Sequence, residues 1–206
     1  MTEQQTHGDS ASRIPTQRIA VFISGGGRTL RNLVSEIRAG RLPAEIVQVV
    51  ASKPCPGLDF AKSEGIQAAV ATDLDREQDV EDLLESSDPD WVIFAGYVKL
   101  LPIPYRYRGR VVNIHPSLLP KFGGKGMYGH RVHAAVLKAG ESESGCTVHL
   151  ADGEYDRGRI IAQARCPVLG GDTPDTLAAR VFELETELYP RALCKLWTEV
   201  CSTPAE

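Results

Sequence analysis

The sequence predicts one α/β domain of the Rossmann-like type, with a mostly parallel, twisted sheet, helices on both faces and an antiparallel C-terminal strand. Three observations indicate this fold. Short apolar runs alternate with segments of helical periodicity, the connections are short, and the first run enters its helix through a glycine-rich turn. The length of 206 residues fits one such domain.

The elements follow from apolar periodicity and from the glycines and prolines that interrupt it. In the first half we expect strands at 18–23, 45–51, 67–71 and 91–95, and helices at 28–39, 58–64 and 76–85. In the second half we expect a strand ending near 115, a glycine-rich loop at 122–129, a helix at 130–138, strands at 146–150 and 160–168, and a helix at 174–196. Pro190 should kink or interrupt this last helix.

Composition excludes several classes of protein. No apolar run approaches the roughly 18 residues that span a bilayer, and polar residues 1–17 predict a disordered leader before a domain at 18–200. A net charge of −4 lacks the excess of positive charge that is typical of nucleic-acid-binding proteins. Five scattered cysteines form neither a disulfide framework nor a zinc site, which favours the cytoplasm and predicts no metal.

Asn113 and His115 are the first candidates for chemistry. Strand alternation places both side chains on one face, where prolines then force the chain out of the sheet. Ligands of open α/β sheets bind at that edge. An amide donor beside an imidazole suits acyl transfer, because one stabilises an oxyanion and the other moves a proton. A loop-capping histidine beside a turn-forming asparagine is the alternative.

The longer string resembles the signature of the folate-dependent formyltransferases, and among them the enzymes that formylate phosphoribosylglycinamide in purine synthesis. It reads Asn113-Ile114-His115-Pro116-Ser117-Leu118-Leu119-Pro120, and the resemblance extends from about residue 18 to about residue 193. It implies the formyltransferase fold, 10-formyltetrahydrofolate as co-substrate and small-molecule substrates. We therefore expect a cytoplasmic monomer or homodimer that needs neither nucleic acid nor a membrane.

The resemblance also implies that Asp156 faces His115. Alone, its surroundings at 152–158 are typical of a hairpin turn. A carboxylate there should raise the pKa of His115 and favour the cation, which stabilises an oxyanion and then protonates the leaving nitrogen. Arg157 and Arg159 depart from the family pattern and leave the shape of this loop open.

The glycine-rich turn at 24–29 follows a strand and opens a helix, so it suits a single phosphate about as well as a plain tight turn. The resemblance implies that Gly27, Arg28 and Thr29 hold the ribose phosphate. The family more often has Ser-Asn at 28–29. Arg28 therefore either adds a charge contact or faces solvent.

Further roles are implied by the resemblance alone. The backbone of Val98, Lys99, Leu100 and Leu101, together with Asn113, should bind the folate. Arg76 should help to place the folate, and Glu185 should hold the substrate amine. The alternatives are ordinary core for 98–101, an exposed helix arginine and a solvated helix face. We interpret His133 and His149 as satisfied structural histidines, and the 123–129 loop as either a mobile lid or a longer turn.

Two alternatives remain open. Methionyl-tRNA formyltransferase and formyltetrahydrofolate hydrolase share the Asn/His/Asp set, but each usually carries a further domain for which 206 residues leave no space. A catalytically inactive folate- or phosphate-binding module would not require Asn113, His115 and Asp156 together.

Overall fold

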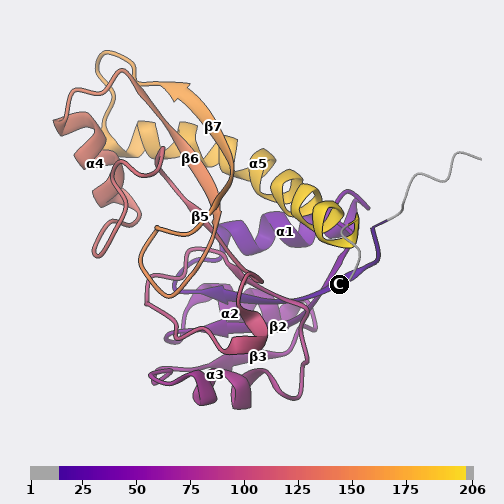
Figure 1. Cartoon of the computed structure of the whole chain (residues 1–206). Coiled ribbons are helices and arrows are strands. Elements are labelled where there is room, and N and C mark those ends of the chain that lie inside the picture. The colour runs from indigo at the N-terminus through magenta and orange to yellow at the C-terminus, as the bar shows by residue number, and fades with distance from the viewer. Residues whose placement is uncertain (1–13, 203–206) are drawn as a thin grey trace, which may run out of the picture.

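The computed structural model describes residues 14–202 and contains a seven-stranded sheet in the order β3-β2-β1-β4-β5-β6-β7 (Figure 1). The strands are β1 (Gln17–Ile23), β2 (Ala44–Ala51), β3 (Ala68–Val70), β4 (Trp91–Phe94), β5 (Val111–His115), β6 (Glu143–Leu150) and β7 (Ile160–Pro167). The helices are α1 (Arg28–Arg38), α2 (Pro56–Ser63), α3 (Glu77–Leu84), α4 (His130–Lys138), α5 (Pro174–Ser202) and the short 3-10 helix η1 (Tyr105–Tyr107). Residues 1–13 of the expected leader lie outside the described part, and Gln17 already belongs to β1.

The predicted fold class is confirmed. Strands β1 to β5 run parallel to one another, and β6 pairs antiparallel with both β5 and β7. The reversed strand is therefore β6, the last but one, and β7 returns to the direction of the parallel set.

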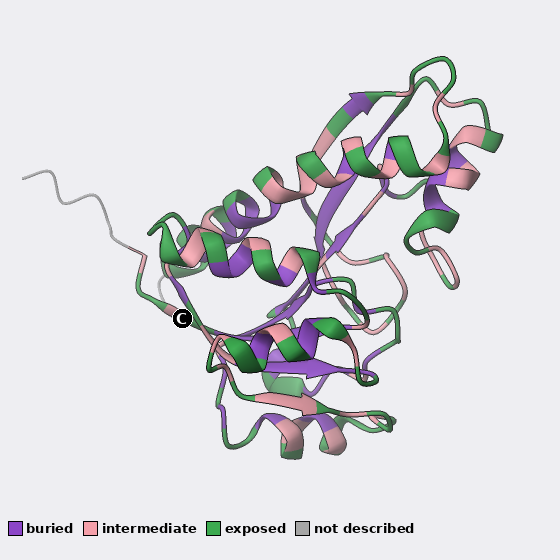
Figure 2. Cartoon of the chain, turned by 180° about the vertical axis from the view of Figure 1, so that it is seen from behind, coloured by how far each residue is buried: buried purple, intermediate pink, exposed green. Residues whose placement is uncertain are grey.

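Strand alternation divides the core into two layers. In β1, Ile19 and Val21 pack with α1, α2, α4 and α5 on one face, whereas Ala20 and Phe22 pack with α3 and the segment around Tyr107 on the other. Figure 2 shows the strands mostly buried and the helices buried along one side only. Helices thus cover both faces, as the sequence predicts.

Helix α5 continues through Pro190 without interruption, contrary to one of the two outcomes we expected. Proline has no N–H for the carbonyl of Thr186 four residues earlier, and that carbonyl instead accepts a hydrogen bond of 2.9 Å from the Asn32 amide. The neighbouring Tyr189 is fully buried, and its hydroxyl lies 3.0 Å and 2.9 Å from the carbonyl oxygens of Phe94 and Val112. These contacts hold α5 against β4 and β5.

Within residues 14–202, no helix is long and apolar enough to cross a membrane.

Candidate active site

A cavity of about 530 Å³ opens where β1, β4 and β5 end. Its lining contains all but one of the site residues expected from the sequence: Gly27, Arg28, Thr29, Val98, Lys99, Leu100, Leu101, Asn113, His115, Asp156 and Glu185. Five separate segments of the chain therefore meet in one place, at the carboxyl edge of the parallel strands.

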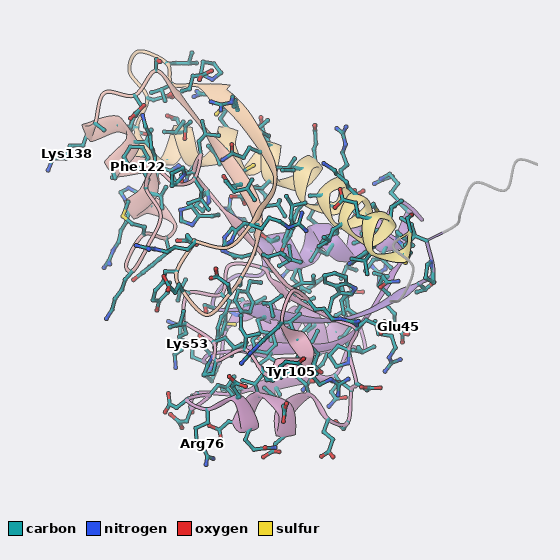
Figure 3. All side chains as sticks on the ribbon, viewed as in Figure 1. Glu45, Lys53, Arg76, Tyr105, Phe122 and Lys138 are labelled. Carbon is teal, nitrogen blue, oxygen red and sulfur yellow. The ribbon has the colours of Figure 1, made fainter. Side chains whose placement is uncertain are left out.

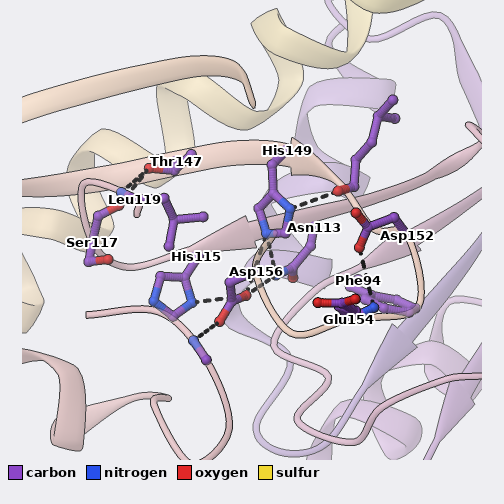
Figure 4. A network of polar contacts seen from close by, with 12 residues as sticks. Phe94, Asn113, His115, Ser117, Leu119, Thr147, His149, Asp152, Glu154 and Asp156 are labelled. Carbon is purple, nitrogen blue, oxygen red and sulfur yellow. Dashed lines mark hydrogen bonds and ion pairs between the residues drawn. The ribbon is translucent and has the colours of Figure 1, made fainter. Parts of the chain in front are cut away.

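Asn113 and His115 lie on the same face of β5, and Asp156 reaches both (Figure 4). The Asp156 Oδ1 atom is 3.5 Å from His115 Nδ1 and 3.5 Å from Asn113 Nδ2. The His115 and Asp156 side chains are only 5% and 9% exposed, so water screens the pair weakly. The predicted constellation of amide, imidazole and carboxylate is thus assembled.

His115 is held in one tautomer when it is neutral. Its Nε2 lies 2.8 Å from the carbonyl oxygen of Phe122, and because a carbonyl only accepts, Nε2 carries the hydrogen. Nδ1 then has the lone pair and faces Asp156 across the longer gap. Nδ1 is therefore the nitrogen placed to take up or release a proton.

The expected rise in the pKa of His115 is not what the structure supports. Burial lowers the pKa of His115 below its ordinary value, and the charge of Asp156 and the Phe122 carbonyl offset this only in part. Burial also raises the pKa of Asp156, but the nearby His149 ring, the His115 charge and the hydrogen bond from the Gly124 amide together lower it below its ordinary value. The carboxylate is thus ionised beside a histidine that is readily deprotonated.

The loop around Asp156 has a shape that explains the glycine after it. A Cβ on Gly158 would lie 1.9 Å from the carbonyl oxygen of Leu150, so only glycine fits this close approach. Asp156 itself has a φ of +57°, which aspartate tolerates better than most residues. Arg157 and Arg159 are both exposed and leave this geometry intact.

The glycine-rich loop begins as part of the site. The Gly124 N–H donates to Asp156 Oδ2 at 2.8 Å, and Phe122, with a φ of +57°, turns its carbonyl to His115. Gly126, Met127, Tyr128 and Gly129 then continue along the cavity wall. The start of this loop therefore positions both His115 and Asp156. This role is additional to the two that we expected from the sequence, a mobile lid or a longer turn.

His149 belongs to the same network, although the sequence suggested only a structural role. It lies directly opposite Asn113 in the β5–β6 ladder. Its Nδ1 donates to the Leu150 carbonyl oxygen at 2.8 Å, so the neutral ring accepts at Nε2 from Asn113 Nδ2, 3.0 Å away. This bond orients the Asn113 amide. The second Nδ2 hydrogen makes only the long contact with Asp156 and stays available to a substrate oxygen.

The turn at 24–29 has the geometry of an anion site. Gly27 is the N-cap of α1 with a φ of +73°, and no side chain among residues 14–202 caps the helix. The first intrahelical bond comes from the N–H of Arg31, so the earlier N–H groups of the first turn point out of the helix end. A Cβ on Gly27 would lie 2.9 Å from Gly57 Cα, which requires glycine here.

Arg28 lines the cavity, stacked 4.0 Å from the ring centre of Phe182. Its charge also acts on Glu185, whose carboxyl lies in the same cavity. Burial raises the pKa of Glu185 to about 7, and Arg28 opposes that rise. A half-buried carboxylate that titrates near neutrality is suited to receive a cationic group.

The segment 98–101 presents backbone and apolar side chains to the cavity. Val98 and Leu100 are 39% and 46% exposed, whereas Leu101 is buried. Arg76 is not brought to the site. It is the N-cap residue of α3, paired with Asp79, its side chain is 77% exposed, and it projects outward in Figure 3. Its expected folate contact has no support from this position.

His133 lies in the cavity wall but is not the satisfied structural histidine we expected. It is 3% exposed, and its Nδ1 has no hydrogen-bond partner within the described residues. Burial, with lesser effects from the charges of His130, His115 and Arg28, lowers the pKa of His133 to about 4. Its ring is therefore neutral at physiological pH.

Known proteins resemble this chain over most of its length. A family model described as formyl transferase matches residues 17–193. The chloroplastic phosphoribosylglycinamide formyltransferase of Arabidopsis thaliana is 41% identical over 88% of this chain, and the Haemophilus influenzae phosphoribosylglycinamide formyltransferase is 35% identical over 89% of this chain and 88% of its own length. The crystal structure of the phosphoribosylglycinamide formyltransferase from Brucella melitensis superposes with a TM-score of 0.79 at 40% identity, covering 93% of this chain and 98% of that one. This chain spans 66% and 61% of the two plant relatives from Arabidopsis thaliana and Vigna unguiculata.

Proposed function

The chain belongs to the formyl transferase family, and from this premise we propose that it transfers the formyl group of 10-formyltetrahydrofolate to the amine of phosphoribosylglycinamide, a step of purine biosynthesis. The observation that carries the proposal is the cluster of Asn113, His115 and Asp156 in a cavity that also holds a helix N-terminus and Glu185. The products are formyl-phosphoribosylglycinamide and tetrahydrofolate.

The reaction begins when the amine nitrogen attacks the formyl carbon. Asn113 donates a hydrogen bond to the tetrahedral oxyanion, and protonated His115, held beside Asp156, adds positive charge. The bond between the formyl carbon and the folate N10 then breaks as a proton reaches N10. His115 supplies that proton through Nδ1, directly or through a water beside Asp156, and the proton released by the amine restores the site.

The two substrates approach from opposite sides of this cluster. The ribose phosphate accepts hydrogen bonds from the backbone amides of Gly27, Arg28 and Thr29, and the Arg28 guanidinium adds a positive charge beside it. The substrate amine binds to the Glu185 carboxylate. The pterin ring lies along the backbone of Val98, Lys99, Leu100 and Leu101, with Asn113 at its inner end. Val98 and Leu100 support this assignment, because they line the cavity and their partly exposed apolar side chains can contact a flat ring.

The enzyme acts on small molecules in the cytoplasm, as a monomer or homodimer, without nucleic acid or a membrane. The free thiols of all five cysteines support a reducing compartment. The net charge of −4 argues against a tRNA acceptor.

The acceptor decides between this function and its relatives. Purified protein is incubated with labelled 10-formyltetrahydrofolate and phosphoribosylglycinamide, with initiator methionyl-tRNA, or in buffer alone. We expect labelled formyl-phosphoribosylglycinamide and little product in the other two reactions. Release of formate at the same rate without an acceptor would identify a hydrolase instead, and formylated tRNA would identify a tRNA enzyme. No turnover in any reaction would leave a binding module.

A further inference from the structure

We propose that Ser24 is a positioning residue for the folate. Its hydroxyl holds the backbone of the 96–101 segment, which we name the pterin loop, in the conformation that receives the ring. The inference rests on the proposed function, which assigns this segment to the folate. Ser24 is not among the described residues that line the cavity, so its action is indirect.

The hydroxyl of Ser24 makes two contacts across three adjacent strands. Ser24 follows β1, which lies between β2 and β4 in the sheet. Its Oγ accepts the N–H of Val98 at 3.2 Å and lies 3.0 Å from the Oγ of Ser52, which follows β2. A hydroxyl has one hydrogen and two acceptor positions, so Ser24 can donate to Ser52 while it accepts from Val98. Ser52 thus turns the Ser24 lone pairs toward the pterin loop.

Burial alone does not hold the pterin loop. Tyr97 and Leu101 are 8% and 2% exposed and anchor its two ends, but Val98 and Leu100 between them are 39% and 46% exposed. On the outer side, the Lys99 ammonium donates to the Thr72 carbonyl oxygen at 2.7 Å. On the inner side, the backbone at Val98 is held by Ser24. The position of this backbone matters because its own N–H and C=O groups are proposed to bind the pterin, and no side chain can take over that role.

The anion site does not depend on Ser24 in the same way. The carbonyl oxygen of Gly25 accepts the N–H of Gly57 at 3.2 Å, and Gly27 packs closely against Gly57 at the start of α2. Helix α2 therefore supports the turn that binds the phosphate. Loss of the Ser24 hydroxyl should disturb the folate side of the cavity and spare the phosphate side.

Steady-state kinetics of Ser24→Ala test this asymmetry. We expect the KM for 10-formyltetrahydrofolate to rise by about 2- to 10-fold, the range of one net hydrogen bond. The KM for phosphoribosylglycinamide and kcat should stay within about twofold of wild type. Ser24→Thr keeps the hydroxyl and should restore the folate KM. The matched control is Ser63→Ala, because within the described part of the chain the Ser63 hydroxyl bonds only the Phe60 carbonyl, at the exposed end of α2.

Amide hydrogen exchange gives a second measurement that needs no activity. In the substrate-free protein, the Val98 amide should exchange faster in Ser24→Ala than in wild type or Ser24→Thr. Unchanged exchange at Val98, an unchanged folate KM, or equal rises in both KM values would overturn the proposal. If wild-type protein formylates no acceptor, the proposed function fails by itself. The exchange rates, with tetrahydrofolate binding measured by calorimetry, then still decide the role of Ser24.

Discussion

Asp156→Asn removes one charge from the site and keeps the shape of the side chain. The asparagine oxygen can still accept the Gly124 amide hydrogen, so the loop should stay in place. At the observed 3.5 Å, unit charges on Asp156 and His115 attract by about 1 kcal/mol in water and by about 5 kcal/mol at an effective dielectric constant of about 20. Because burial already favours the neutral ring of His115, its protonation equilibrium should move toward the neutral form by about tenfold or more.

An NMR titration of the His115 ring, paired with the pH dependence of kcat, measures this effect. The pKa of His115 should fall in Asp156→Asn. Since the cation is the proposed active form, the loss of kcat should be about tenfold or more at neutral pH, where the lowered pKa leaves the ring mostly neutral in both proteins. The loss should shrink in acid, where the ring becomes protonated in both. Asp152→Asn is the matched control in the same loop, since Asp152 is exposed and, among the residues that the structure describes, accepts a hydrogen bond only from the Glu154 amide. Identical His115 titrations in wild type and Asp156→Asn would show that the two side chains do not interact. An equal loss of activity in the control would show that the effect is not specific to Asp156.

Two further predictions concern the substrate phosphate and the stability of the fold. Gly27→Val should raise the KM for phosphoribosylglycinamide by about 10- to 100-fold and the KM for the folate by far less, because a charged hydrogen bond to the phosphate is lost. In wild type, sulfate should compete with the ribonucleotide and not with the folate. Equal changes of the two KM values would place the anion site elsewhere. Asp172 accepts two hydrogen bonds from Arg180, at 2.7 Å and 2.9 Å, and these hold its pKa well below the usual range. A lowered carboxyl pKa stabilises the fold above the unfolded value and loses that effect in acid, so Asp172→Asn should lower Tm at pH 7, with the difference shrinking below about pH 4. A Tm difference that does not change with pH would contradict this.

The pairing of Asn113 with His115 could be predicted from sequence because it depends only on strand alternation. The order of strands and helices followed from local periodicity for the same reason. The approach of Asp156 to His115 was implied by the family resemblance, and the close contact of Gly158 with Leu150 now gives it a physical basis.

The features that the sequence did not reveal depend on tertiary structure. His149 meets Asn113 because β6 is reversed and its register places them opposite each other, and neither fact is local. The direction of the His115 pKa shift depends on a burial depth that periodicity does not give. Arg76 is drawn to Asp79 in the first turn of α3 and away from the cavity. The continuity of α5 through Pro190 relies on Asn32, which comes from α1.

The proposed function assigns the proton transfer of the formyl transfer reaction to His115, and single-turnover kinetics of His115→Ala measure that role. With saturating 10-formyltetrahydrofolate and phosphoribosylglycinamide, formyl transfer should slow by about 100-fold or more. Tetrahydrofolate binding should change little, because the pterin is held at the backbone of residues 98–101. A variant that transfers the formyl group at a near-normal rate would show that His115 does not carry the proton transfer.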